Sequence, residues 1–140
     1  MDEDEVLIDF GEEKYRASDD FEGIARRVIK ENPEFTQLRT GAVRIAYQIC
    51  ASHRKKGGGI VYADTEKVKD KIKQFMPYDF IITVYPEGQE LDAEHRYRLM
   101  YHELLHVGFE PESNKFSILP HDCEDFRSCM AKWGSDWVVS

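Results

Sequence analysis

The sequence lacks the features that mark membrane and exported proteins. Its longest apolar run, Phe80 to Tyr85, contains a threonine and falls far short of the ~20 residues that span a bilayer. The chain starts with Met-Asp-Glu-Asp-Glu, the opposite of the basic start of a secretory signal. We therefore expect neither a membrane segment nor export.

Cysteine is also scarce, with three residues in a chain of 140: Cys50, Cys123 and Cys129. Their number is odd and no CxxC pair occurs, which argues against both a disulfide framework and a Cys-rich structural metal site. We expect reduced thiols and a cytoplasmic location.

The residues that are present suffice for one folded domain. Hydrophobic side chains make up 41% of the chain and aromatic side chains 12%, and aromatic groups need burial to offset the entropy cost of ordering. There is no internal repeat and no low-complexity linker. We expect a single domain over residues 1–140, with an acidic N-terminal arm over residues 1–16.

Charge is distributed unevenly along the chain. The net charge of −8 disfavours general binding to a phosphate backbone. Residues 2–13 hold seven acids and no bases, whereas bases predominate over residues 54–73. The second stretch is a candidate nucleic-acid patch, although such runs are more often solvated faces.

Apolar periodicity predicts an α+β fold, with a small mixed or mostly antiparallel sheet packed by three or four helices. Ser18 is a predicted N-cap for a helix that ends at Asn32-Pro33. A glycine break at 57–59 and a turn at 86–88 are also expected, and a helix should begin near Asp92. The other expected elements are a strand or ordered arm over 6–10, a helix over 34–52, a strand over 60–63, a short helix over 68–75 and a strand over 78–85.

The helix that follows Asp92 contains an HExxH motif over residues 102–106. His102 and His106 are spaced i, i+4 on one helix face, so both imidazoles can bind one zinc ion. Glu103 lies ~100° around the helix, where it can take a proton from a metal-bound water. The apolar residues of this helix fall on the opposite face, so the histidines are not part of the core stripe.

A catalytic zinc site of this type needs a third protein ligand. The metzincin pattern is absent, because Phe109 and Glu112 stand where it requires glycine and histidine. His121 is the favoured third ligand, since it is neutral and follows a helix-breaking proline. Glu124 is the alternative ligand, and Asp122 is a candidate for orienting a ligand histidine or capping a final helix that runs through Trp133.

Four segments together resemble the putative phage metallopeptidase family, which comprises compact zincin-like proteins distantly similar to the SprT-like proteases. These segments are Arg44–Tyr47, Tyr78–Ile82, Tyr101–His106 and His121–Phe126. The resemblance covers roughly residues 35–135. It implies His102, His106 and His121 as metal ligands and Glu103 as the general base, in a protein of phage or prophage origin.

The expected function is zinc-dependent hydrolysis of a peptide bond, with one Zn²⁺ per chain and a protein or peptide substrate. The strand over 60–63 is the candidate edge for pairing with that substrate. Tyr78, Tyr101 and His95 are the candidates for stabilising the oxyanion.

Two other functions stay open. One is a catalytically silent interaction module that zinc stabilises, in which Cys123 would supply a fourth ligand. The other is a peptidase that the basic stretch over 54–73 localises on DNA, which salt-dependent DNA binding would reveal. An open coordination position favours an enzyme over a module.

Overall fold

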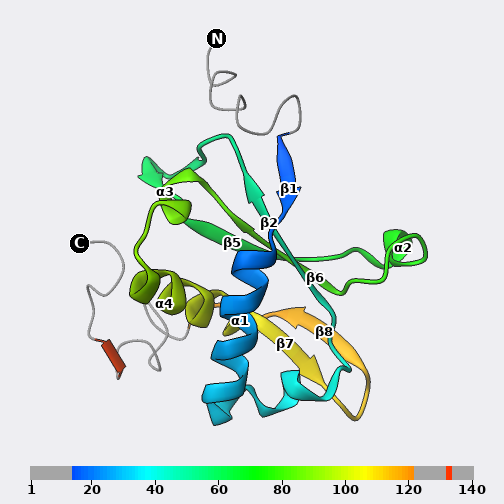
Figure 1. Cartoon of the computed structure of the whole chain (residues 1–140). Coiled ribbons are helices and arrows are strands. Elements are labelled where there is room, and N and C mark those ends of the chain that lie inside the picture. Colours follow the sequence, from blue (N-terminus) through cyan, green and yellow to red (C-terminus); the bar gives the residue numbers. More distant parts are fainter. Residues whose placement is uncertain (1–13, 122–131, 134–140) are drawn as a thin grey trace.

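The computed structural model describes residues 14–121 and 132–133, and it confirms the α+β class (Figure 1). Its centre is a four-stranded sheet of order β1-β2-β6-β5. The strands are β1 (Tyr15–Ala17), β2 (Ile45–Cys50), β5 (Ala63–Lys67) and β6 (Phe80–Val84). The sheet is mixed, because β2 and β6 are parallel while β1 and β5 run antiparallel to their neighbours.

Two hairpins and several helices surround this sheet. The strand pairs are β3 (Lys55–Lys56) with β4 (Gly59–Ile60), and β7 (Val107–Glu110) with β8 (Lys115–Ile118). The helices are α1 (Asp19–Glu31), the 3-10 helix η2 (Pro33–Thr40), α2 (Asp70–Lys73), α3 (Pro86–Gln89) and α4 (Ala93–Leu104). None of the helices among these described residues is long and apolar enough to cross a membrane.

The main core lies between one face of the sheet and the helices α1 and α4. Alternate residues of the central strands, such as Tyr47 and Ile82, meet the apolar stripes of both helices there. The predicted core face of α4 is confirmed, since Met100 and Leu104 are almost fully buried. The predicted N-cap of α1 is confirmed as well, because the Ser18 hydroxyl oxygen accepts a hydrogen bond from the Phe21 amide.

The helix predicted over residues 34–52 is wrong. Helix η2 ends at Thr40, where Gly41 adopts a left-handed conformation at φ 81° that favours glycine and terminates helices. The chain then continues as β2, which pairs in parallel with β6 so that Ile45 lies opposite Phe80. The apolar residues of this stretch fit helical spacing and strand alternation alike, and only the distant β6 decides between them.

Several other boundaries also differ from expectation. The strand predicted over 60–63 is replaced by β4 and β5, the short helix over 68–75 shrinks to α2, and the turn at 86–88 is the short helix α3. The strand predicted over 78–85 is confirmed as β6, and the glycine break is the turn of the β3–β4 hairpin, with positive φ at Gly57 and Gly58. The predictions for residues 6–10 and for most of the acidic arm lie outside the described residues.

Candidate metal centre

Helix α4 and the turn that ends it carry the first two histidines, His102 and His106. The helix begins near Asp92 as predicted, and Asp92 caps it, because its side chain accepts a hydrogen bond from the His95 amide. The helix ends at Leu104, so His106 follows it rather than lying within it. A tight last turn, in which the His106 amide donates to the Glu103 carbonyl at 3.0 Å, keeps His106 beside His102.

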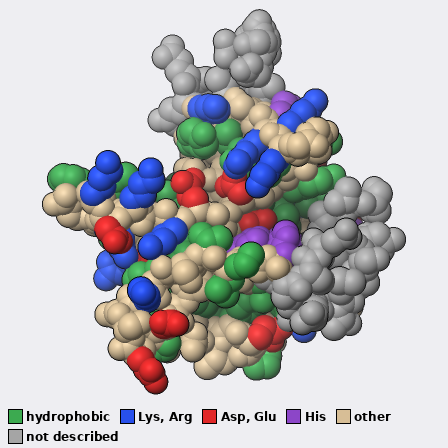
Figure 2. Space-filling model, turned by 180° about the vertical axis from the view of Figure 1, so that it is seen from behind, with side chains coloured by type: hydrophobic (Ala, Val, Ile, Leu, Met, Phe, Trp, Pro, Cys, Tyr) green, Lys and Arg blue, Asp and Glu red, His purple; other side chains and the backbone are tan. Residues whose placement is uncertain are grey.

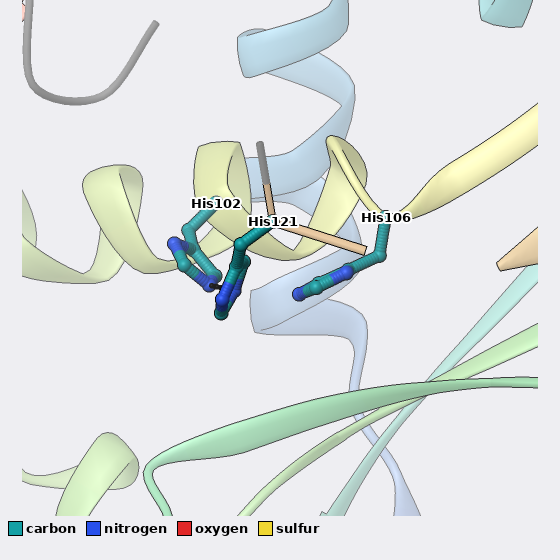
Figure 3. A group of neighbouring side chains, drawn as sticks. All are labelled: His102, His106 and His121. Carbon is teal, nitrogen blue, oxygen red and sulfur yellow. Dashed lines mark hydrogen bonds between the residues drawn. The ribbon is translucent and has the colours of Figure 1, made fainter. Parts of the chain in front are cut away.

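The rings of His102, His106 and His121 point toward one another (Figure 3). The nitrogens that they can offer to a metal all lie within 4.8 Å of one another. The Nε2 atoms of His102 and His121 are 3.0 Å apart. Two ligands in a tetrahedral zinc site with Zn–N bonds of 2.0–2.1 Å lie about 3.3 Å apart. The three side chains therefore fit a single metal ion of zinc's size and ligand preference.

The β7–β8 hairpin brings His121 back to α4. The Leu119 amide donates to the His106 carbonyl at 2.8 Å, and the Leu119 carbonyl oxygen lies 2.7 Å from His106 Nδ1. A carbonyl oxygen only accepts hydrogen bonds, so Nδ1 carries the proton of the neutral ring. This tautomer presents an unprotonated Nε2, the form that a metal requires.

Glycine at position 108 permits the close approach of the two hairpin strands. A Cβ atom at Gly108 would lie 2.5 Å from the Ser117 side-chain oxygen and 2.9 Å from its carbonyl oxygen. A Cβ atom does not approach another heavy atom this closely in a folded protein. The hairpin that positions Leu119 and His121 therefore depends on this glycine. The sequence interpretation did not identify Gly108, because the contact forms only once β8 is paired.

Glu103 lies beside the histidines with 4% of its surface exposed. The Thr65 hydroxyl lies 2.7 Å from Glu103 Oε1, to which it donates, and 3.1 Å from the Glu103 carbonyl oxygen. Burial raises the pKa of Glu103 to about 7, although the hydrogen bond from Thr65 acts to lower it. A carboxyl group with such a pKa can both accept and donate a proton near neutral pH.

The sequence did not indicate a role for Thr65 in the site either. It stands in the middle of β5, whose sequence Ala-Asp-Thr-Glu-Lys carries no apolar run and no motif. Its role becomes visible only because β5 packs beside α4, which the local sequence does not encode.

The three oxyanion candidates receive no support from their positions. The Tyr101 hydroxyl donates to the Glu34 carboxylate, and its ring packs edge-on against Phe35 at 5.1 Å in the core. The His95 Nδ1 atom lies 2.8 Å from Asp92 Oδ1 at the start of α4. Tyr78 lines a separate cavity beside α1 and η2.

The segment that follows His121 is described only at residues 132–133, which are helical. The Trp133 ring contacts the Tyr101 ring edge-on at 5.0 Å, so the chain lies against α4 again at this point. The alternative ligand Glu124, the orienting residue Asp122 and the possible fourth ligand Cys123 lie outside the described residues.

Comparison with known proteins identifies the family. A search of curated proteins and a search of solved structures found no match. A family model described as "Putative phage metallopeptidase" matches residues 13–139 and so includes all three histidines and Glu103. The name implies a bound metal and a protein substrate, in agreement with the histidine cluster. The chain belongs to the putative phage metallopeptidase family.

Proposed function

We propose that the protein is a zinc-dependent peptidase in which His102, His106 and His121 bind the metal and Glu103 is the general base. The observation that carries this proposal is the convergence of three imidazoles beside a buried carboxyl group. Neutral imidazoles suit Zn²⁺, and three protein ligands leave a fourth position for water or substrate, as in catalytic zinc sites.

Each residue has a defined part in this proposal. When bound, zinc polarises the scissile carbonyl and makes a coordinated water more acidic. Glu103 would accept the proton of that water and pass it to the leaving amine. A nearby cation lowers the pKa of a carboxyl group, so the zinc-loaded protein would hold Glu103 in the ionised form that a base requires.

We propose β5 as the strand that binds the substrate, in place of the segment over 60–63. It is the edge strand beside α4, and Thr65 at its middle contacts the proposed base. An extended peptide that pairs with an edge strand gains main-chain hydrogen bonds. A peptide bound along β5 would therefore pass close to the three histidines.

The substitution Glu103→Gln tests the proposal, because it keeps the size of the side chain and removes the proton acceptor. We expect about one zinc ion per chain in both the wild type and the variant, with the zinc content measured by mass spectrometry. Hydrolysis of casein or of a peptide library should fall by about 10²–10⁴-fold, the usual contribution of a positioned base.

The matched control is Glu112→Gln, which makes the same chemical change on an exposed residue of the β7–β8 turn. It should cleave at the wild-type rate. Equal cleavage by wild type and Glu103→Gln would exclude the assigned role. Zinc binding without any cleavage would favour the interaction module instead.

A further inference from the structure

Two groups of lysines lie at the two ends of the edge strand β5. The hairpin lysines are Lys55 and Lys56, and the α2 lysines are Lys67, Lys69 and Lys71. The hairpin is held to the start of β5 by an ion pair between Arg54 and Asp64. The hydrogen bond from the Val61 amide to the Arg54 carbonyl extends the pairing of the hairpin by one step toward β5. The α2 lysines begin at the last residue of β5.

All five lysines are exposed, and within the described part of the chain no acidic side chain forms an ion pair with any of them. Neighbouring basic residues, in contrast, are paired with acidic side chains. Arg54 is paired with Asp64, and Lys73 lies 2.8 Å from Asp79. The five lysine charges are therefore available to a charged ligand.

The candidate metal centre lies between the two groups. Thr65, at the middle of β5, contacts Glu103, and a strand rises ~3.3 Å per residue, so Lys67 is about 7 Å further along the edge. Figure 2 shows this face of the molecule, with blue side chains gathered on two sides of the central histidines. The acids Asp64 and Glu66 belong to the stretch of β5 between the two groups.

We propose that the substrate is a peptide segment with an uncharged centre and acidic residues on both sides of the scissile bond. This inference rests on the proposed function, because it takes the substrate to run along β5. Whichever way the peptide runs along β5, one lysine group lies on each side of the cleaved bond. Carboxylates two or more residues from that bond would meet the lysines.

The same charges disfavour a nucleic acid as the ligand. A phosphate backbone is uniformly negative, so its middle would face Glu66, whose carboxylate has no ion-pair partner among the described residues, whereas the charge of Asp64 is compensated by Arg54. A peptide with an uncharged centre avoids this repulsion and still reaches the lysines at both ends. The arrangement of charges along β5 thus favours a peptide of this pattern.

Three peptides with one shared uncharged centre test the inference. Their flanks carry aspartate and glutamate, serine, or lysine. We expect kcat/KM of the zinc-loaded protein to be about 10-fold higher for acidic flanks than for serine flanks at low salt, the sum of several exposed ion pairs. The preference should shrink in 0.5 M NaCl, because salt screens exposed charges.

Paired substitutions locate the effect. Lys55→Gln with Lys56→Gln, and Lys69→Gln with Lys71→Gln, should each lower kcat/KM for the acidic peptide by about 3-fold and change the value for the serine peptide much less. The control pair Lys30→Gln with Lys115→Gln removes the same charge on α1 and β8 and should alter neither value.

A binding assay separates this inference from the proposed function. The acidic and serine peptides, fluorescently labelled, are titrated into the zinc-loaded Glu103→Gln protein and followed by anisotropy. Tighter binding of the acidic peptide that both lysine pairs weaken supports the inference, even if the wild type cleaves nothing and the proposed function fails. Equal cleavage and equal binding of the two peptides would overturn the inference and leave the peptidase intact. Displacement of the acidic peptide by a lower concentration of single-stranded DNA would overturn it in favour of a nucleic-acid surface.

Discussion

The Thr65 hydroxyl lies 2.7 Å from Oε1 of Glu103, although 38 positions separate the two residues in the sequence. This hydrogen bond joins the middle of the edge strand β5 to the HExxH helix. It fixes one oxygen of the buried carboxylate and so sets the direction in which the side chain points. The strand proposed to bind substrate thereby also orients the proposed base.

Replacing Thr65 with valine should therefore weaken catalysis without removing the metal. Valine keeps the shape of the side chain but leaves Glu103 Oε1 without that donor, which costs about 1–3 kcal/mol of stability for a buried group. We expect a roughly 10-fold lower kcat with unchanged zinc content. The conservative variant Thr65→Ser retains a hydroxyl and should recover most of the activity; equal loss in both variants would show that packing, not the hydrogen bond, matters.

Each of the three histidines should be needed for metal binding. His102→Ala, His106→Ala and His121→Ala each remove one imidazole from the cluster, and we expect zinc content to fall well below one per chain. His53→Ala is the control, since His53 is exposed and interacts with Glu87 at a distance of 2.7 Å. Full zinc content in any of the three cluster variants would remove that residue from the ligand set.

Metal removal should lower the melting temperature while leaving the secondary structure in place. The core between the sheet, α1 and α4 is formed by apolar residues such as Phe21, Val28 and Met100, none of which is a proposed ligand. Chelated protein should keep its far-ultraviolet circular dichroism and melt at a lower temperature, because a ligand that binds only the folded state stabilises it. Unfolding on chelation, as in zinc fingers, would instead favour the interaction module.

Gly108→Ala should disturb the metal centre indirectly, through the hairpin strand β8. The added methyl group would lie 2.5 Å from the Ser117 side-chain oxygen, so β8 must shift and carry Leu119 with it. We expect a stability loss of about 1–3 kcal/mol, as for overpacking, and weaker zinc binding. Gly23→Ala is the control, because a methyl group on that exposed helical position contacts nothing within 4 Å and should stabilise α1 by about 0.5–1 kcal/mol. Zinc affinity at the wild-type level in Gly108→Ala would contradict the role given to this glycine.

The parts of the fold and site that follow from local sequence were predictable, and the parts that depend on distant pairing were not. The HExxH spacing and the helix start near Asp92 are local signals, and both predicted α4, although the helix ends at Leu104, before His106. The identity of β2 depends on β6, whose partner residues lie 35 positions away, as Gln48 and Thr83 do. Local spacing fits a helix or a strand there, so the sequence could not decide between them.

The positioning contacts of the site are non-local in the same way. The Leu119 carbonyl reaches His106 only through the completed hairpin, and Thr65 reaches Glu103 only through packing of β5 beside α4. Residue type alone marks histidine and glutamate as reactive groups. It does not mark a threonine in a polar strand or the backbone carbonyl of a leucine.

The last prediction concerns the metal-free protein and the pH dependence of its stability. Burial raises the pKa of Glu103 from its ordinary value of 4.5 to about 7. Between these two values the folded state keeps a proton that the unfolded state has lost, so the free energy of unfolding falls as pH rises through this window. In Glu103→Gln the side chain at this position is uncharged at every pH, and its amide oxygen can still accept the hydrogen bond from Thr65. The variant should thus resemble wild type below pH 4.5 and become more stable than it by at most about 3 kcal/mol above pH 7. Urea unfolding of both chelated proteins at pH 4.5, 6 and 7.5 measures this difference, and a difference that stays constant across the three values would show that Glu103 titrates normally in the fold.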